Sequence, residues 1–392
     1  MKVIVAPDKF KGSLSAPDAA HALARGVLRA DPSATIDLVP MADGGEGTVE
    51  ALVEATGGSY REVVVTGPLG HPTEARYGIL GDGRTAVVEM AAASGLVLVR
   101  QADRNPLEAT TFGTGELILA AIAAGVERLI VGIGGSATND GGAGLAQALG
   151  YQLLDASGHP LPPGGGPLQA LDRIIAPEFN RLLGVEIAVA CDVANPLCGP
   201  SGASAVYGPQ KGATAEDIVV LDHNLEHFAR IIERDLGADV AGLPGSGAAG
   251  GLGAGLIAFA GGALEPGVSL VIEAVRLADR LAGADLCLTA EGAIDHSTAF
   301  GKTAVGVARL ARSLGCPTLA LSGMIGPGAQ DVLREGVDAF FSICPGPATL
   351  GEAMSHAPDW LERAGEQATR AFLAGFRRSR SWEESREGST HV

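Results

Sequence analysis

The chain has 392 residues, of which 45 are acidic and 28 are lysine or arginine, giving a formal net charge of −17. This balance excludes a general binder of nucleic acid or of anionic membranes, because neither phosphate surface would attract the protein. The length exceeds what one core usually supports, and 46% of the residues are hydrophobic, so we expect a soluble globular protein of two domains.

The N-terminal segment predicts a strand, a helix and a second strand. KVIVAP has the β-branched content of a strand, SAPDAAHALARGVLRA has a helical pattern with Ser15 as N-cap, and TIDLVPMADGG follows as strand and loop. The apolar run before Pro7 is too short for a signal peptide or an anchor. The five cysteines form no CxxC pair, so neither a disulfide framework nor a zinc site is indicated. We therefore expect a cytoplasmic protein.

The pattern of elements changes twice along the chain. REVVVTGPLG, TEARYGIL and TAVVEMAAA follow one another with Gly/Pro turns, which predicts antiparallel hairpins. ADLCLTAEG, CPTLALSG and DAFFSIC alternate with helical patterns, which predicts a parallel α/β arrangement. We expect an α/β protein with a discontinuous first domain, an inserted second domain and a disordered tail; their expected limits are 1–72 with 285–376, 73–284 and 377–392.

The stretch GIGGSATNDGGAG at 132–144 contains six glycines between a predicted strand and a predicted helix. Glycines permit positive φ angles and a close approach of backbone N–H groups to a ligand, and a helix N-terminus adds partial positive charge. The alternative is a turn needed only for packing, for which one or two glycines would suffice. We interpret the stretch as an anion site, with candidate contacts at Gly134, Gly135, Ser136, Thr138 and Asn139.

Lysine is rare in this chain and its positions are informative. The five lysines are Lys2, Lys9, Lys11, Lys211 and Lys302, whereas the other basic residues are arginines. The last four lie in turn-rich segments, PDKFKGS, GPQKGA and FGKTA. A compact ammonium facing phosphate or carboxylate oxygens would explain them, with chance as the alternative.

Acidic residues follow three predicted strands. MADGGEGT contains Asp43 and Glu46, ACDVANPLCG contains Asp192, and LTAEGAID contains Glu291 and Asp295. Such carboxylates can coordinate Mg²⁺, accept a hydroxyl proton or cap the next helix. Together with an anion loop and lysines, they are the parts expected for metal-assisted phosphoryl transfer.

Two familiar nucleotide motifs fail on their context. GSGAAG at 245–250 matches GxGxxG, but it follows a weak strand and lacks the acidic residue about twenty positions on. GKT at 301–303 precedes a helix, but a Walker A loop needs glycine where His296 stands.

Seven ordered segments resemble the type I glycerate kinase family from Met1 to about Phe376. They are APDKFKGSLSA, ADGGEGT, GTGEL, GIGGSATNDGGAG, CDVANPLCG, GPQKGA, and EGAID with GKTAVGVA. The resemblance implies ATP-dependent phosphorylation of D-glycerate with Mg²⁺, giving 2-phosphoglycerate in many bacterial members. It also implies a Rossmann-like parallel-sheet domain formed by both chain ends and an inserted mixed α/β domain.

One family segment, usually GEGRIDSQT, is altered in this chain. Ala290 replaces its first glycine, Ala293 its arginine and Ser297 its glutamine. No role that depends on the missing guanidinium or amide can therefore be carried over. The matching positions are Glu291, Asp295, Thr298, Gly301 and Lys302.

These residues suggest roles in a kinase reaction. The glycine-rich loop would hold either ATP phosphates or the glycerate carboxylate. We favour Asp295 as the general base, because Lys302 stands seven residues on, with Asp192 as the alternative. Asp43 or Asp192 would contribute a Mg²⁺ ligand. A nicotinamide-dependent hydroxy-acid dehydrogenase and a small-anion binding protein remain the rival functions.

Overall fold

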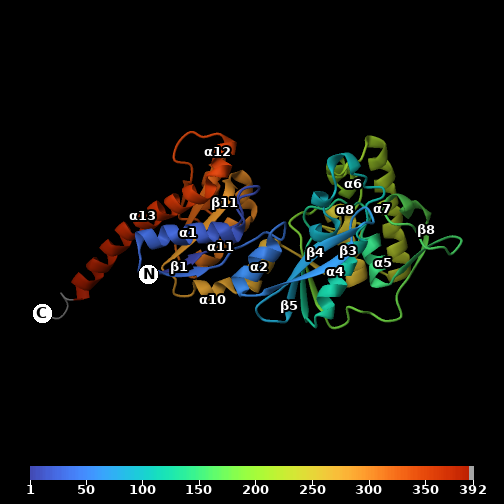
Figure 1. Ribbon diagram of the computed structural model, residues 1–392, viewed down its shortest axis with the longest axis horizontal. Helices are drawn as coiled ribbons and strands as arrows, with labels where there is room; N and C mark the ends of the chain where they lie inside the picture. The colour runs from blue at the N-terminus through green and yellow to red at the C-terminus, as the bar shows by residue number, and fades with distance from the viewer. Residues whose placement is uncertain (388–392) are drawn as a thin grey trace. The chain divides into compact units, whose positions relative to one another are not determined.

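The protein is described by a computed structural model that covers residues 1–387, and it consists of two compact units. The first joins Met1–Ala42 with the C-terminal part from Ile272, and the second is Asp43–Val271. Figure 1 shows the blue N-terminal and red C-terminal segments together in the first unit, with green and yellow segments in the second. The predicted fold class is confirmed: the protein is an α/β protein in which both chain ends form one domain and the segment between them forms the inserted second domain.

A five-stranded parallel sheet forms the centre of the first unit. Its order is β13-β12-β11-β1-β2, so the strand from the N-terminus lies beside strands from the C-terminal part. The central strands β1 and β11 and the first part of β12 are buried, as the interior of a parallel sheet requires, whereas the edge strands β2 and β13 are partly exposed. The strands are β1 (Lys2–Val5), β2 (Thr35–Leu38), β11 (Leu286–Ile294), β12 (Thr318–Ile325) and β13 (Ala339–Ser342).

Helix α1 (Ala16–Ala30) begins where the sequence predicts. The Ser15 hydroxyl accepts a hydrogen bond from the Asp18 backbone N–H at 3.2 Å. A Cβ at Gly26 would overlap backbone atoms of α13 (Ala357–Glu387), so glycine permits the close packing of the two helices seen in Figure 1. The other helices of this unit are α10 (Leu277–Leu281), η5 (His296–Phe300), α11 (Thr303–Ser313), η6 (Ala329–Leu333) and α12 (Leu350–Ser355).

A mixed six-stranded sheet forms the centre of the second unit. Its order is β10-β9-β6-β5-β4-β3, with antiparallel pairing for β3-β4-β5 and parallel pairing for β5-β6-β9-β10. The predicted hairpins are thus confirmed. The strands are β3 (Ser59–Thr66), β4 (Pro72–Ile79), β5 (Thr85–Glu89), β6 (Arg128–Gly132), β9 (Glu186–Ala190) and β10 (Ala263–Glu265), and a separate hairpin pairs β7 (Gln152–Asp155) with β8 (Leu171–Ile175).

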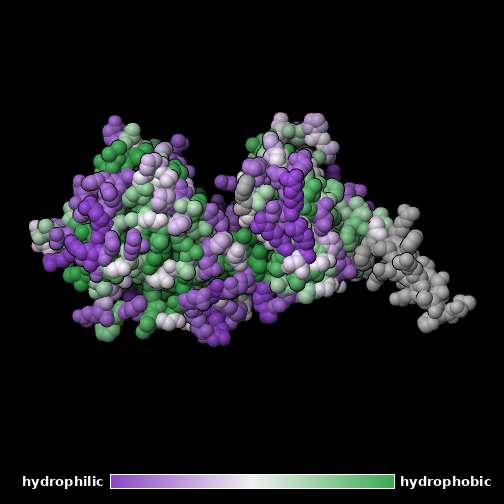
Figure 2. Space-filling model, turned by 180° about the vertical axis from the view of Figure 1, so that it is seen from behind, coloured by the Kyte–Doolittle hydropathy of each residue, from purple (hydrophilic) through white to green (hydrophobic). Residues whose placement is uncertain are grey.

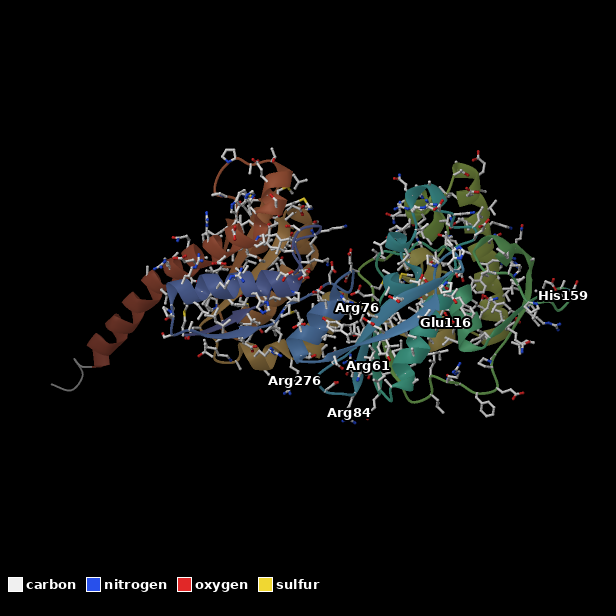
Figure 3. The ribbon with its side chains drawn as sticks, viewed as in Figure 1. Arg61, Arg76, Arg84, Glu116, His159 and Arg276 are labelled. Carbon is white, nitrogen blue, oxygen red and sulfur yellow. The ribbon has the colours of Figure 1, made fainter. Side chains whose placement is uncertain are left out.

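Helices surround this second sheet. The carboxylate of Glu116 on α4, labelled in Figure 3, accepts a hydrogen bond from the Thr66 backbone N–H at 2.6 Å and so joins α4 to β3. The helices are α2 (Thr48–Thr56), α3 (Ala91–Ser94), η1 (Leu96–Leu98), η2 (Gln101–Asp103), α4 (Phe112–Ala123), α5 (Ala143–Leu149), η3 (Gly166–Ala170), α6 (Ala203–Tyr207), η4 (Pro209–Lys211), α7 (Ala215–Leu236) and α8 (Ala248–Ala260). Helix α9 (Gly267–Ala274) spans the change from the second unit to the first.

The limits of the units differ from the boundaries expected at residues 72 and 284. Strand β3 pairs along its length with β4, from Ser59 opposite Ile79 to Thr66 opposite Pro72. A hairpin cannot be divided between two cores, so β3 belongs to the inserted unit. The charged segment expected to be disordered from residue 377 is instead helical to Glu387 within α13, and residues 388–392 lie outside the described part of the chain.

The surface in Figure 2 carries many hydrophilic residues in purple, interspersed with hydrophobic ones in green. Within residues 1–387, no helix combines the length and apolar character needed to span a bilayer.

Candidate active site

The glycine-rich stretch forms a loop between β6 and α5, as its sequence context predicts. Gly135, Gly141 and Gly142 have φ angles of +75°, +64° and +82°, which residues with a Cβ rarely adopt. The first part of the loop borders a cavity of about 270 Å³ within the second unit. Its polar lining comes from Asp43, Gly44, Gly45, Gly134, Gly135, Ser136, Asp192, Tyr207, Gln210 and Lys211.

Lys211 is a buried cation at the wall of this cavity. Its side chain is almost fully enclosed, with 1% of the residue exposed. The ammonium donates hydrogen bonds to Ser136 Oγ at 2.7 Å and to the Thr138 carbonyl oxygen at 2.6 Å. Burial lowers the pKa of Lys211 to about 7, and the nearby carboxyl of Asp140 opposes this shift. An anion bound in the cavity would stabilise the charged ammonium, and the ammonium would attract the anion.

Asp140 holds the second half of the loop in place. Its Oδ2 accepts hydrogen bonds from the Thr111 backbone N–H and hydroxyl, both at 2.8 Å, and from the Gly144 N–H at 3.1 Å. Its Oδ1 accepts from the Gly142 N–H at 3.1 Å. Burial raises the pKa of this carboxyl, and the hydrogen bonds oppose that shift. The N–H groups at the start of α5 therefore bind an internal carboxylate, not the ligand anion that the sequence analysis expects there.

Thr138 and Asn139 lie beneath the cavity and do not line it. Both are fully buried, and the Asn139 amide donates to Ser204 Oγ at 2.9 Å. The Thr138 hydroxyl has no hydrogen-bond partner within the described part of the chain, while its carbonyl accepts from Lys211. This geometry favours a role in supporting the anion loop. It does not favour the direct contact with a ligand that we expect from the sequence.

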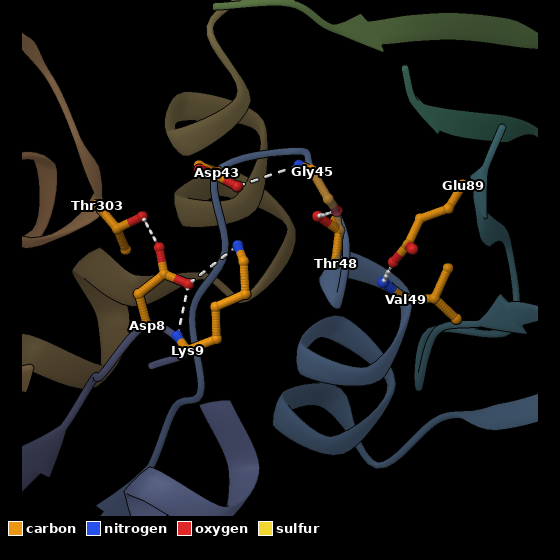
Figure 4. Close-up of polar contacts among 8 residues, drawn as sticks. All are labelled: Asp8, Lys9, Asp43, Gly45, Thr48, Val49, Glu89 and Thr303. Atoms are coloured by element: carbon orange, nitrogen blue, oxygen red, sulfur yellow. Dashed lines mark hydrogen bonds and ion pairs between the residues drawn. The ribbon is translucent and has the colours of Figure 1, made fainter. Parts of the chain in front are cut away.

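Asp43 and Asp192 face the same cavity from two different loops. Asp43 Oδ1 accepts from the Gly45 N–H at 3.1 Å, as Figure 4 shows, and Asp192 Oδ1 accepts from the Gly267 N–H at 2.9 Å. A Cβ at Gly267 would overlap the Asp43 carbonyl, so glycine allows this close approach. Partial enclosure raises the pKa of Asp192, and the negative charge of Asp43 adds to the effect, although solvent reaches this side chain.

These two carboxylates fit one kind of metal site. Among residues 1–387, no group of three or more His, Cys, Asp or Glu side chains is arranged to hold a metal by itself. Mg²⁺ usually keeps several waters and takes only one or two protein carboxylates, with substrate phosphates completing its coordination. Asp43 and Asp192 match that donor set.

A polar cluster also lies within the first unit, around the end of β1. Asp8 is buried, and its Oδ2 accepts from the Thr303 hydroxyl at 2.6 Å at the start of α11 (Figure 4). Its Oδ1 accepts from the Lys9 backbone N–H at 2.6 Å and lies 3.6 Å from Lys9 Nζ. Neither Asp8 nor Thr303 is among the site residues expected from the sequence. An aspartate directly after the first buried strand was the available signal.

Glu291 lies beside this cluster on β11. The Asp8 backbone N–H donates to the Ala290 carbonyl at 2.7 Å, which places the loop after β1 next to Glu291. The residue is 7% exposed, and its Oε1 has no hydrogen-bond partner among residues 1–387. Burial raises the pKa of Glu291 to about 7; Lys302 and the Thr298 hydroxyl oppose this shift, whereas Asp8 and Asp295 add to it.

Asp295 acts as a helix cap. Its Oδ1 accepts from the Ser297 backbone N–H at 2.8 Å and from the Ser297 hydroxyl, and the Thr298 hydroxyl accepts from the Asp295 N–H at 3.2 Å. These Ser297 bonds, together with Lys302 Nζ at 4.0 Å, lower the pKa of Asp295. A carboxylate held in this way is a weak proton acceptor, which argues against the favoured general base. Ser297, one of the departures from the family segment, donates both of the hydrogen bonds to Asp295 Oδ1.

The structure thus groups the predicted residues within each unit. Lys211, Asp43, Asp192, Gly134, Gly135 and Ser136 line one cavity in the second unit. Glu291, Asp295, Thr298 and Lys302 lie together in the first, with Lys302 and Asp295 forming an ion pair. Lys9 pairs with Asp8 in that unit, and Lys11 is exposed.

Comparison with known proteins identifies close relatives over nearly the whole chain. The model of the Glycerate kinase family matches residues 3–373. A protein of Bacillus subtilis (strain 168) named glycerate kinase is 54% identical over 364 residues, covering 93% of this chain and 95% of the relative. A protein of Escherichia coli (strain K12) named glycerate 2-kinase is 47% identical over 378 residues, covering 96% of this chain and 99% of the relative.

A solved structure is similar as well. It is a crystal structure of "putative glycerate kinase 2" from Salmonella typhimurium LT2, with a TM-score of 0.87 and 48% sequence identity. The match covers 96% of this chain and 99% of that chain, so both units belong to the shared fold.

Proposed function

We propose a specific reaction and site for this chain, which belongs to the Glycerate kinase family and is an ATP-dependent phosphotransferase acting on glycerate. The reaction is the transfer of the γ-phosphoryl group of ATP to the C2 hydroxyl of D-glycerate, giving 2-phosphoglycerate and ADP. The name of the Escherichia coli relative, glycerate 2-kinase, supports this choice of hydroxyl.

The observation that carries the proposed site is Lys211, a buried ammonium that donates to Ser136 at the wall of the second-unit cavity. A lysine is costly to bury, and the nearby Asp140 carboxyl offsets only part of the effect of burial, so an anion in the cavity would explain its position. Backbone N–H groups at Gly134–Ser136 and this ammonium would hold phosphate or carboxylate oxygens. Because the hydrogen bonds are formed before the ligand arrives, they need no rearrangement during the reaction.

Asp192 is the group that we assign to accept the proton. The C2 hydroxyl oxygen of glycerate bonds to the γ-phosphorus, the bond from that phosphorus to ADP breaks, and the hydroxyl proton passes to a carboxylate. The pKa of Asp192 is raised, and its carboxylate accepts one hydrogen bond, from the Gly267 N–H. The pKa of Asp295 is lowered, and its carboxylate caps η5. The raised pKa makes Asp192 the better acceptor of the two.

Mg²⁺ fits the same cavity. Asp43 would hold it, directly or through water, and the ion would offset the negative charge of the phosphates. Within the first unit, Lys302 is available as a positive charge for phosphate oxygens, because its side chain is 43% exposed and only one carboxylate lies within 4.0 Å of it in the described structure.

Phosphorus NMR tests the reaction directly. The protein is mixed with ATP, Mg²⁺ and D-glycerate, and the product resonances are compared with those of authentic 2- and 3-phosphoglycerate. We expect 2-phosphoglycerate and ADP in equal amounts, with much slower turnover of L-glycerate. Exclusive formation of 3-phosphoglycerate would contradict the assigned hydroxyl, and absence of product would favour an anion-binding protein.

A further inference from the structure

Glu291 occupies an unusual position for a carboxyl group. It stands near the C-terminal end of β11, opposite Ser322 of β12, and 7% of the residue is exposed. Its Oε1 is buried without a hydrogen-bond partner among the residues that the structure describes. A buried polar oxygen left without a partner is costly in free energy, so such an atom points to a group that is absent from the chain itself.

Burial and the surrounding charges together determine the pKa of Glu291. Asp8, which is buried and bonded to Thr303, and Asp295 each repel a second negative charge, while Lys302 attracts it. Lys9 pairs with Asp8, and His296 pairs with Asp331 at 3.5 Å. Burial is the largest influence and raises the pKa of Glu291 to about 7. Burial is therefore the main reason that the neutral carboxylic acid is favoured relative to the ionised form at this position.

We propose that Glu291 acts as a neutral hydrogen-bond donor, which gives its proton to a shared hydrogen bond with an anionic oxygen of a bound substrate. Lys302 and the Thr298 hydroxyl stand beside it as the other groups that would face this oxygen. The ligand is a carboxylate or a phosphate, and the inference rests on the proposed kinase function for its identity. This role differs from that of a general base or a metal ligand, both of which need the ionised carboxylate.

A defined pH dependence follows. The bound anion favours the protonated form of Glu291. The affinity for the anion is therefore highest below about pH 7 and declines above it, as Glu291 of the free protein loses its proton. The decline is about tenfold per pH unit. Lys211 of the second unit loses its proton in the same range, so the profile of the wild-type protein alone cannot isolate Glu291.

Three variants separate the possibilities. Glu291→Gln keeps the shape and the donor but cannot ionise, Glu291→Leu removes the donor, and His296→Asn removes a neighbouring titratable group as a control. KM and kcat are measured for D-glycerate and for ATP from pH 6 to pH 9, and binding of D-glycerate alone and of inorganic phosphate is measured by calorimetry. Thermal unfolding of each variant establishes that it is folded.

We expect Glu291→Gln to retain kcat/KM within about threefold of the wild-type value at pH 6.5, because its amide still donates. Above about pH 7, the ratio of wild-type KM to variant KM should rise about tenfold per unit for one substrate, which identifies the anion that Glu291 contacts. Glu291→Leu should raise that same KM by about tenfold to a hundredfold at every pH. His296→Asn should follow the wild-type profile.

Other outcomes overturn the proposal. A folded Glu291→Gln protein that loses more than a hundredfold in kcat at all pH values would show that the ionised carboxylate is needed. If the ratio of wild-type KM to Glu291→Gln KM stays constant across the pH range, the ionisation of Glu291 does not affect ligand binding. If the wild-type protein fails to turn over D-glycerate, the kinase function fails separately, and the phosphate-binding profile of Glu291→Gln still decides the role of the residue.

Discussion

Lys211 Nζ donates a hydrogen bond to Ser136 Oγ at 2.7 Å, although the two residues stand 75 positions apart in the chain. The ammonium is buried and also donates to the Thr138 carbonyl, so it both charges the cavity and holds the loop that forms its wall. Replacing the lysine by an uncharged side chain removes both the charge and these hydrogen bonds.

Lys211→Met keeps most of the side-chain volume and removes the charge. We expect kcat to fall by roughly a hundredfold or more, the scale for one preorganised electrostatic contact. Steady-state kinetics with ATP and D-glycerate measure this. Lys2→Met is a matched control, because Lys2 Nζ donates to carbonyl oxygens of Arg280 and Ala282 away from the cavity. Equal kcat in both variants would show that the reaction does not need the charge of Lys211.

Asp192→Asn and Asp295→Asn form a pair that identifies the proton acceptor. We expect a large fall in kcat, at least a hundredfold, for Asp192→Asn, with nucleotide affinity little changed, because the amide keeps the size and loses the basicity. Asp295→Asn should lose about 1 kcal/mol or less of stability through its weakened cap and retain most of its kcat. Kinetics and urea unfolding of both proteins provide the comparison. The reverse pattern would restore Asp295 as the base.

Lys302→Ala tests the exposed cation of the first unit. If the ammonium offsets phosphate charge during transfer, kcat should drop by roughly a hundredfold while the melting temperature stays within a few degrees. Lys11→Ala, also an exposed lysine of this unit, is measured beside it. A Lys302→Ala protein with unchanged kcat and lowered thermal stability would instead mark the pair with Asp295 as structural.

Asp140→Ala removes the internal anchor of the glycine-rich loop. The carboxylate accepts bonds from Thr111, Gly142 and Gly144, and its loss leaves their buried donors without partners. We expect the free energy of unfolding to fall by about 2–4 kcal/mol. Denaturant titration measures it, with Asp155→Ala in the exposed β7–β8 hairpin as the reference. A loss below about 1 kcal/mol would show that the loop does not depend on Asp140.

Metal removal tests the proposed Mg²⁺ site. Turnover should cease in excess EDTA and return when Mg²⁺ is added beyond the chelator. Asp43→Asn should raise the Mg²⁺ concentration needed for half-maximal rate, since the carboxylate ligand is lost. Full activity in EDTA would remove the metal from the reaction.

The amino-acid sequence by itself determined the elements, because their signals are local. The N-cap at Ser15, the hairpins of β3–β5 and the glycine loop between β6 and α5 are all set by residues within a few positions of one another. The domain limits required more, since only the pairing of β3 with β4 assigns residues 59–66 to the inserted unit.

Only the tertiary structure decided what the polar side chains contact. A lysine, an aspartate and a glycine loop in sequence do not reveal that Asp140 binds the N–H groups at the start of α5, or that Thr138 and Asn139 face inward. Nor does sequence separate Asp192, whose pKa is raised by partial burial and by the charge of Asp43, from Asp295, whose carboxylate accepts hydrogen bonds from Ser297. The reason is that pKa and hydrogen bonding depend on burial and on neighbours brought together from distant parts of the chain, and these exist only once the chain has folded.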